Sequence, residues 1–137
     1  MLTISAKGTY GLAAVFELAK QYNQGPLHIK FIAETQGIPQ NYLEQLLVKL
    51  KKAQIVKSYR GAQGGYELAD SPANITVNDI LNCLEGQLEL VHNSGKIKSI
   101  AQLWQTAHQV INDVFNITLE ELVLQEKRLD KQIVYSI

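Results

Sequence analysis

Five polar side chains between residues 41 and 52 recur at the spacing of one face of an α-helix. The opposite face of the same segment is a leucine stripe of the kind that packs on a core. Amides and carboxylates hydrogen-bond to base edges and lysines bind phosphates, so this order along the helix is typical of a recognition helix in the major groove. The alternative is an ordinary amphipathic helix with a solvated face. The polar residues are Asn41, Glu44, Gln45, Lys49 and Lys52, and the stripe is Leu43, Leu46, Leu47 and Leu50.

A glycine-rich turn with an arginine at its mouth follows this helix. Residues 55–59 and 66–68 are rich in β-branched and aromatic side chains, which predicts the two strands of a hairpin. Arg60 at the base of so slim a turn can enter a minor groove, where the negative potential of DNA is concentrated. The candidate DNA contacts are therefore Lys7, Gln40, Asn41, Tyr42, Glu44, Gln45, Lys49, Lys52, Arg60, Gly61 and Gly64.

The segments that must position these residues form a winged helix-turn-helix pattern. Ser5 predicts the N-cap of a first helix through about residue 22, and Gly25 with Pro26 ends it. A second helix over residues 29–36 and a turn over residues 37–39 precede the third helix, which runs from residue 40 to about 53. Pro39 suits the first helical position, where its missing N–H costs nothing. We therefore predict a mainly α fold, with a winged helix-turn-helix and a two-stranded β wing over residues 1–85.

The second half of the chain predicts a separate function. Thr76 with Asp79 predicts a capping box for a helix through residue 85, and a loop over residues 86–98 follows. A long helix from residue 99 to about 117 carries a wide apolar stripe, which on so small a protein favours a subunit interface over a second core. Thr118 with Glu121 predicts a short closing helix over residues 119–127, so residues 99–137 would form the dimerisation helix, closing helix and tail. The candidate interface residues are Ile100, Leu103, Trp104, Ala107, Ile111 and Val114.

The charge of the chain is unevenly distributed although its net value is zero. Residues 1–70 carry eight Lys/Arg and five Asp/Glu, and the remaining residues carry five and eight. Such a local positive region indicates a face for an anionic partner, such as double-stranded DNA. No apolar run reaches the roughly 18 residues of a membrane span, and a single cysteine agrees with a reducing compartment. We therefore expect a cytoplasmic protein with no membrane contact.

The sequence lacks the residue patterns of an enzyme. It contains no combination of nucleophile, base and acid, no phosphate-binding glycine loop and no cluster of metal ligands. We therefore expect no catalytic residues. Two other functions remain open at this stage. One is a winged helix used for protein–protein contact, which would need neither the polar row nor Arg60, and the other is a small-molecule sensor with a pocket between the two halves.

Several ordered blocks make the chain resemble the Rrf2 family of bacterial transcription regulators along essentially its whole length. The resemblance implies a winged-helix dimer whose long helices cross and which binds a palindrome. Carried over by position, Asn41, Glu44 and Gln45 would read bases and Arg60 would insert at the wing. The matching blocks are residues 4–12, 42–46, 60–66, 79–80 with 84–86, 103–104, and 118–122.

One departure from the family concerns its iron–sulfur cluster. Many members hold the cluster through three cysteines in the loop after the Leu-Glu-Gly block, and residues 86–110 here contain none. The chain therefore resembles the cluster-free branch that represses cysteine and sulfur metabolism, and we expect no cofactor and no metal. Cys83 is interpreted as a small apolar residue rather than a redox switch. Other departures are His28, at the position of a capping Ser, and Thr9, where the family often has Arg.

The cluster-free branch also implies a partner protein. That partner is O-acetylserine sulfhydrylase, whose other ligands present a C-terminal isoleucine carboxylate. This chain ends in Ile137, so the resemblance implies that Ile137 binds in the cleft of that enzyme. A frayed chain end without function is the alternative. A redox-responsive or small-molecule-responsive Rrf2 regulator of another regulon is the alternative for the function as a whole.

Overall fold

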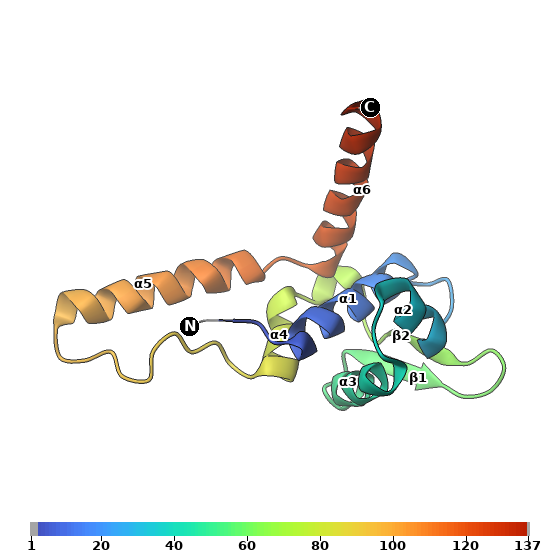
Figure 1. Ribbon diagram of the computed structural model, residues 1–137, viewed down its shortest axis with the longest axis horizontal. Helices are drawn as coiled ribbons and strands as arrows, with labels where there is room; N and C mark the ends of the chain where they lie inside the picture. Colours follow the sequence, from blue (N-terminus) through green and yellow to red (C-terminus); the bar gives the residue numbers. More distant parts are fainter. Residues whose placement is uncertain (1–2, 137) are drawn as a thin grey trace.

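The computed structural model describes residues 3–136, with side chains through residue 132, and it confirms a mainly α winged helix-turn-helix (Figure 1). The two strands pair antiparallel, with Lys57 opposite Glu67 and Tyr59 opposite Gly65. In chain order the elements are α1 (Ala6–Lys20), α2 (Ile29–Gln36), α3 (Gln40–Lys52), β1 (Val56–Tyr59), β2 (Gly65–Leu68), the 3-10 helix η1 (Pro72–Asn74), α4 (Val77–Glu85), α5 (Lys98–Phe115) and α6 (Leu119–Ser136).

The apolar faces of α1 to α4 and the inner side of the wing close around one core. All four leucines of the predicted α3 stripe are at most 2% exposed, so that stripe faces the core as predicted. Each fully buried aliphatic side chain contributes about 1.5–3 kcal/mol to folding. We refer to this part of the molecule, residues 3–85, as the body. Its other fully buried large side chains are Val15, Leu18, Ile32, Val56, Leu68 and Ile80.

A carboxylate at the end of α4 fixes the first turn of α1. Glu85 Oε1 accepts the backbone N–H groups of Ser5 at 2.9 Å and of Gly8 at 3.0 Å, and it also accepts the Ser5 hydroxyl. The Ser5 hydroxyl above all holds the pKa of Glu85 below its ordinary value, and the nearby charge of Lys7 adds to this effect. A negative charge at this end of α1 also complements the helix dipole. Glu85 therefore joins the two ends of the body.

A second carboxylate joins α1 to α2. Glu17 is 4% exposed, accepts a hydrogen bond from Gln36 Nε2 at 2.6 Å and pairs with Lys20 Nζ at 3.0 Å. A buried charge needs such partners because its hydration is lost. The contact holds α2 in place although His28, the N-cap of this helix, makes no side-chain cap hydrogen bond.

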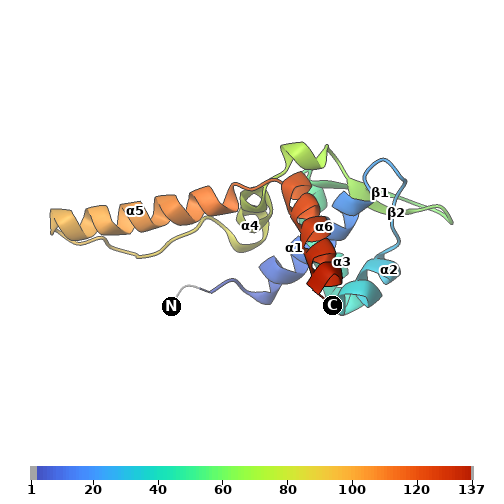
Figure 2. The ribbon, with the colours of Figure 1, turned by 90° about the horizontal axis from the view of Figure 1, so that it is seen from above.

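Helix α5 extends away from the body, and none of its residues is buried. Figures 1 and 2 show that α5 and the wing project from opposite ends of the molecule. Near its C-terminal end, α5 is attached to α4 through Asn78 Nδ2, which donates to the carbonyl of Asn112 at 3.0 Å. We refer to residues 86–116 as the arm.

An isolated antiparallel bridge ties the segment before α6 to the segment before α4. Val77 N–H donates to the carbonyl of Ile117 at 3.0 Å, and Leu119 N–H donates to the carbonyl of Ile75 at 2.9 Å. Leu119 is fully buried in the core just beyond this bridge. The arm therefore leaves the body and returns to it at a fixed place.

The closing helix is longer than predicted. The capping box at Thr76 and Asp79 is present, and Glu121 N–H donates to Thr118 Oγ1 at 3.1 Å, but α6 continues to Ser136 instead of ending near residue 127. The prediction of a short helix followed by a tail is therefore wrong. Its physical reason is composition, since residues 119–136 contain neither glycine nor proline and are rich in strong helix formers. No helix within residues 3–136 is both long and apolar enough to cross a membrane.

Candidate nucleic-acid interface

The exposed face of α3 carries the row of polar side chains that the sequence predicts. Because the leucine stripe is buried, the other side of the helix faces solvent along its whole length. One further residue lies in this row, since Val48 is 41% exposed and follows Gln45 by three positions. Sequence reasoning missed it because it is apolar, although its spacing from Asn41 and Glu44 was a usable signal. The exposed row is Asn41, Glu44, Gln45, Val48, Lys49 and Lys52.

The start of α3 is positioned by an aromatic pair. Tyr42 is half-buried, and its ring packs edge-on against Tyr10 of α1, with centroids 5.8 Å apart. Gln40 is exposed and is the first helical residue, so Pro39 is the N-cap rather than the first residue of the helix. Pro39 provides no side-chain cap, which leaves the first N–H groups of α3 open to a phosphate.

The wing carries one cation that is paired within the hairpin and one that is not. Lys57 Nζ lies 3.4 Å from Glu67 Oε1, which also accepts the Tyr59 hydroxyl at 2.7 Å. Tyr59 first and then Glu67 raise the pKa of Lys57 above its ordinary value. Arg60 is exposed, and no ion pair among residues 3–132 involves it. The unpaired charge at the tip of the wing is therefore that of Arg60.

Two glycines shape the turn of the wing differently. Gly61 is exposed and has a φ of +94°, a conformation that side-chain-bearing residues rarely adopt. Gly64 is buried, and a Cβ at this position would lie 2.4 Å from the Tyr59 carbonyl oxygen. The turn can therefore close only with glycine at position 64. Lys51 Nζ donates to Ser58 Oγ at 2.7 Å and so joins the end of α3 to the wing.

Lys7 lies in another element, α1. It is half-buried in the first turn of α1, where its charge helps to lower the pKa of Glu85. The structure therefore joins α3 to the wing through Lys51 and places Lys7 beside the contact between α1 and α4.

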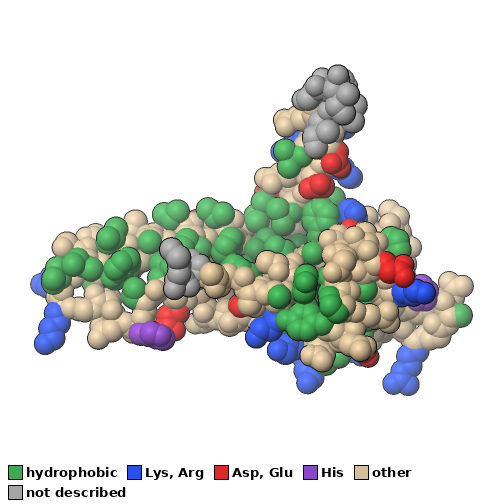
Figure 3. Space-filling model, in the orientation of Figure 1, with side chains coloured by type: hydrophobic (Ala, Val, Ile, Leu, Met, Phe, Trp, Pro, Cys, Tyr) green, Lys and Arg blue, Asp and Glu red, His purple; other side chains and the backbone are tan. Residues whose placement is uncertain are grey.

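The candidate interface residues of α5 form an unburied apolar stripe. Leu103 is 57% exposed and Val114 is 64% exposed, and Val110, which the sequence analysis left out, is 57% exposed on the same side. Figure 3 shows hydrophobic side chains running along α5 toward the base of α6. The other members of the stripe are exposed or half-buried, namely Ile100, Trp104, Ala107 and Ile111.

The loop before α5 does not fit an iron–sulfur cluster. Such a cluster requires several thiolates, and the chain contains a single cysteine, Cys83 on α4. Burial raises the pKa of the Cys83 thiol, which also contacts the backbone carbonyl of Lys49 at 3.6 Å. Among the described residues, no three His, Cys, Asp or Glu side chains lie close enough together to hold a metal ion.

A helix-turn-helix with an exposed polar row on its second helix and an arginine-tipped wing defines a class of DNA-binding regulators. Comparison with known proteins identifies the family. The Rrf2 model, described as an iron-dependent transcriptional regulator, matches residues 4–125, and the chain belongs to this family. It is a DNA-binding transcription regulator.

Relatives from several bacteria resemble the chain over most of its length. It is 41% identical to the HTH-type transcriptional regulator CymR of Bacillus subtilis over 125 residues, which cover 88% of this chain and 89% of the relative. The solved structure of CymR, the global cysteine regulator of B. subtilis, aligns with a TM-score of 0.83 at 40% identity over 91% of this chain and 98% of that one. The structure of T. potens IscR aligns with a TM-score of 0.79 at 42% identity over 91% and 88%.

Proposed function

We propose that this chain represses transcription by binding a palindromic operator as a homodimer, with the α3 row in the major groove. The exposed row beside an arginine-tipped wing carries this proposal. Asn41, Glu44 and Gln45 lie near the N-terminal end of α3, where they would contact base edges. Lys49 and Lys52 lie toward its C-terminal end, where they would contact phosphates.

Apart from Lys7, which would contact a phosphate, the remaining candidate DNA contacts take more specific roles in this proposal. Gln40 and the open first turn of α3 would bind a phosphate, while Tyr42 would hold the helix in place through its packing on Tyr10. Arg60 would enter the minor groove next to Gly61. We assign Gly64 to shaping the turn, since it is buried.

The homodimer would form through the apolar stripe of α5. A stripe with this exposure is costly in water, and a second copy of the same helix would cover it. A two-fold dimer presents two α3 helices related by symmetry, and such an arrangement matches a palindrome.

The genes under control would be those of cysteine and sulfur metabolism. CymR of B. subtilis is described as the global cysteine regulator, and this chain is 41% identical to CymR. The single cysteine argues for a regulator without an iron–sulfur cluster, although the family model is described as iron-dependent. Protein purified without oxygen should be colourless and contain no stoichiometric iron, and a visible absorption band with bound iron would contradict this.

The proposed partner is O-acetylserine sulfhydrylase, bound through the carboxylate of Ile137. This residue lies outside the described part of the chain, so the proposal rests on the sequence resemblance and on the chemistry of chain-end recognition. O-acetylserine would compete for the same cleft and release the regulator. Calorimetry should show binding by the intact chain and none after deletion of Ile137. Equal binding by both forms, or by neither, would exclude this partner.

Selection of bound duplexes from a random pool tests the DNA-binding proposal directly. The purified protein should enrich one palindromic sequence, with an affinity that falls steeply as salt rises. Enrichment of no sequence, together with a salt-independent interaction with a protein partner, would instead support a winged helix used for protein–protein contact. The enriched sequence would also show which genes carry the operator.

A further inference from the structure

The face of α5 that points away from the apolar stripe is rich in hydrogen-bond donors and lines a hollow. Lys98, Gln102, Gln105 and His108 follow one another at intervals of four, three and three residues, so they lie on one side of the helix. The opposite wall is the loop before α5, which contributes apolar side chains that include Leu88. The hollow has a volume of about 690 Å³.

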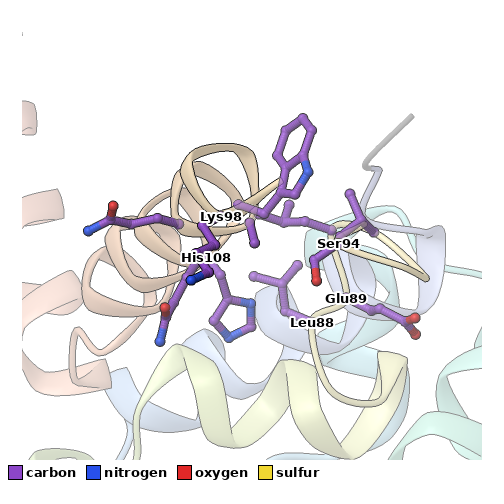
Figure 4. Close-up of a pocket in the computed structure, with 11 residues that line it drawn as sticks. Leu88, Glu89, Ser94, Lys98 and His108 are labelled. Carbon is purple, nitrogen blue, oxygen red and sulfur yellow. The ribbon is translucent and has the colours of Figure 1, made fainter. Parts of the chain in front are cut away.

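The walls of the hollow favour an anion. In Figure 4, Lys98 and His108 lie on one side of the hollow and Ser94 lies on the other. Glu89 is the one acidic residue among the described residues that line it. Its carboxylate points away from Lys98 and His108 in Figure 4, and it pairs with His92 Nδ1 at 3.0 Å.

The first turn of α5 adds further donors at the Lys98 end. Ile97 is the N-cap of this helix and provides no side-chain hydrogen bond, so the first backbone N–H groups of α5 lack a side-chain acceptor. The N-terminal end of a helix also carries a partial positive charge, and the charge of Lys98 reinforces it. One end of the hollow therefore combines a cation, open N–H groups and space for a ligand.

We propose that this hollow binds a small organic acid with an elongated, partly apolar body. Its anionic group would lie at Lys98 and the first turn of α5, and its body would pack between Leu88 and Trp104. His108 follows Lys98 by ten residues, which corresponds to about 15 Å along a helix. A ligand that extends in this direction would find a second set of donors at Gln105 and His108.

Trp104 gives the hollow a connection to assembly, and this part of the inference depends on the proposed dimer. Trp104 lines the hollow and also lies at the edge of the apolar stripe. An acid bound against its indole would change the position of a side chain at the proposed subunit interface. The hollow is thus placed to transmit a metabolic signal to the DNA-binding dimer.

Two dyes with the same apolar body test the site on the intact protein. Anilinonaphthalene sulfonate is anionic, and N-phenylnaphthylamine lacks the sulfonate. The affinity of each dye is measured by fluorescence for the native protein, for the double variant Lys98→Gln/His108→Gln, and for the control Lys96→Gln. Lys96 is an exposed lysine near the hollow that does not line it. Because Trp104 is the single tryptophan, its indole N–H resonance in isotope-labelled protein shows whether the dye binds beside it.

The double variant should bind the anionic dye about tenfold more weakly, the loss expected when charge-assisted hydrogen bonds are removed. The neutral dye should change less than about twofold, and Lys96→Gln should behave as the native protein does. The site would be overturned if the native protein did not bind the anionic dye, or if all three proteins bound it equally. It would also be overturned if the dye bound without shifting the Trp104 resonance. Equal losses for both dyes would overturn the site as well. Operator binding without dye is measured separately, and its failure would contradict the proposed DNA-binding function instead.

Discussion

Helices α3 and α5 have the same amphipathic pattern, yet their apolar stripes meet different environments. The leucines of α3 are at most 2% exposed because α1, α2 and α4 cover them. On α5, Leu103 and Val114 are each more than half exposed, and no residue of their stripe is buried within the described chain. The period of an apolar stripe thus predicts which side of a helix needs a partner, while only the fold shows whether the chain supplies that partner.

The largest effect is expected from a charge placed in the α5 stripe. Trp104→Glu should give monomers, because a buried interface does not tolerate an unpaired carboxylate. Operator affinity should fall on the order of a hundredfold, because two half-sites are no longer bound by linked modules. The body should stay folded, since Trp104 is not part of its core. Light scattering and DNA titration measure both effects.

Gln109→Glu is the matched control, because it places the same charge on the opposite side of α5, at an exposed residue that does not line the hollow. This variant should remain dimeric and bind the operator. A Trp104→Glu protein with the mass of a dimer would show that α5 is not the subunit interface.

Within the body, substitutions along α3 should separate two kinds of DNA contact. Glu44→Ala should relax the preference for one base pair by about 1–3 kcal/mol. Lys52→Ala should weaken binding to all sequences alike and reduce the slope of affinity against salt by about one. Titrations with the selected operator and with single-base variants at several salt concentrations distinguish them. If the two variants changed sequence preference and salt dependence in the same way, the orientation that we assign to α3 on the DNA would be wrong.

Removing the contact between Glu85 and the start of α1 should have a smaller effect than the substitutions on α5 and α3. This effect is on the stability of the fold and should depend on pH. Glu85→Gln should lower the free energy of unfolding by about 1–2 kcal/mol near neutral pH, since hydrogen bonds to a charged acceptor are lost. The folded-state pKa of Glu85 is depressed, so its contribution is fully present above the unfolded pKa of about 4.3 and is lost as pH falls through the lower folded value. The difference between the two proteins should therefore shrink below about pH 4.

Denaturant unfolding at several pH values measures this difference. Glu34→Gln is a suitable control because Glu34 is exposed on α2, and it should leave stability nearly unchanged. A Glu85→Gln difference that stays constant down to strongly acidic pH would contradict the role of the carboxylate.

The smallest expected effect concerns the exposed apolar residue of α3. If DNA covers Val48, its methyl groups should contact a thymine methyl in the major groove. Replacing that thymine by uracil should cost the native protein about 0.5–1 kcal/mol, close to the value of one buried methylene. Val48→Ala should be much less sensitive to the same replacement. Equal sensitivity of the two proteins would show that Val48 does not lie over a thymine.

Local signals explain what could be predicted from the sequence. Three predicted features depend on residues close together in the chain, and the structure has all three. They are the leucine stripe, the hairpin and the capping box of Thr76 with Asp79. The end of α6 was missed because no glycine or proline marks it, so a capping signal at its start revealed nothing about its length.

Contacts between distant residues explain what could not be predicted. Glu85 and Ser5 are 80 positions apart, and no local sequence pattern near either residue predicts their contact. The buried state of Gly64 depends on how the turn closes against Tyr59, and the hollow beside α5 depends on the path of the preceding loop. In each case the residue type can be read from the sequence, but the residue that it contacts is known only from the fold.

The bridge between the segments before α4 and α6 has a consequence for how this molecule can change. Because both ends of the arm are anchored to the body, insertions or deletions within residues 87–97 would leave the attachment of α6 and the DNA-reading surface in place. Doubling the length of a flexible loop costs only about 0.6 kcal/mol of closure entropy. Evolution can therefore change the length and sequence of this loop while keeping the DNA-binding surface.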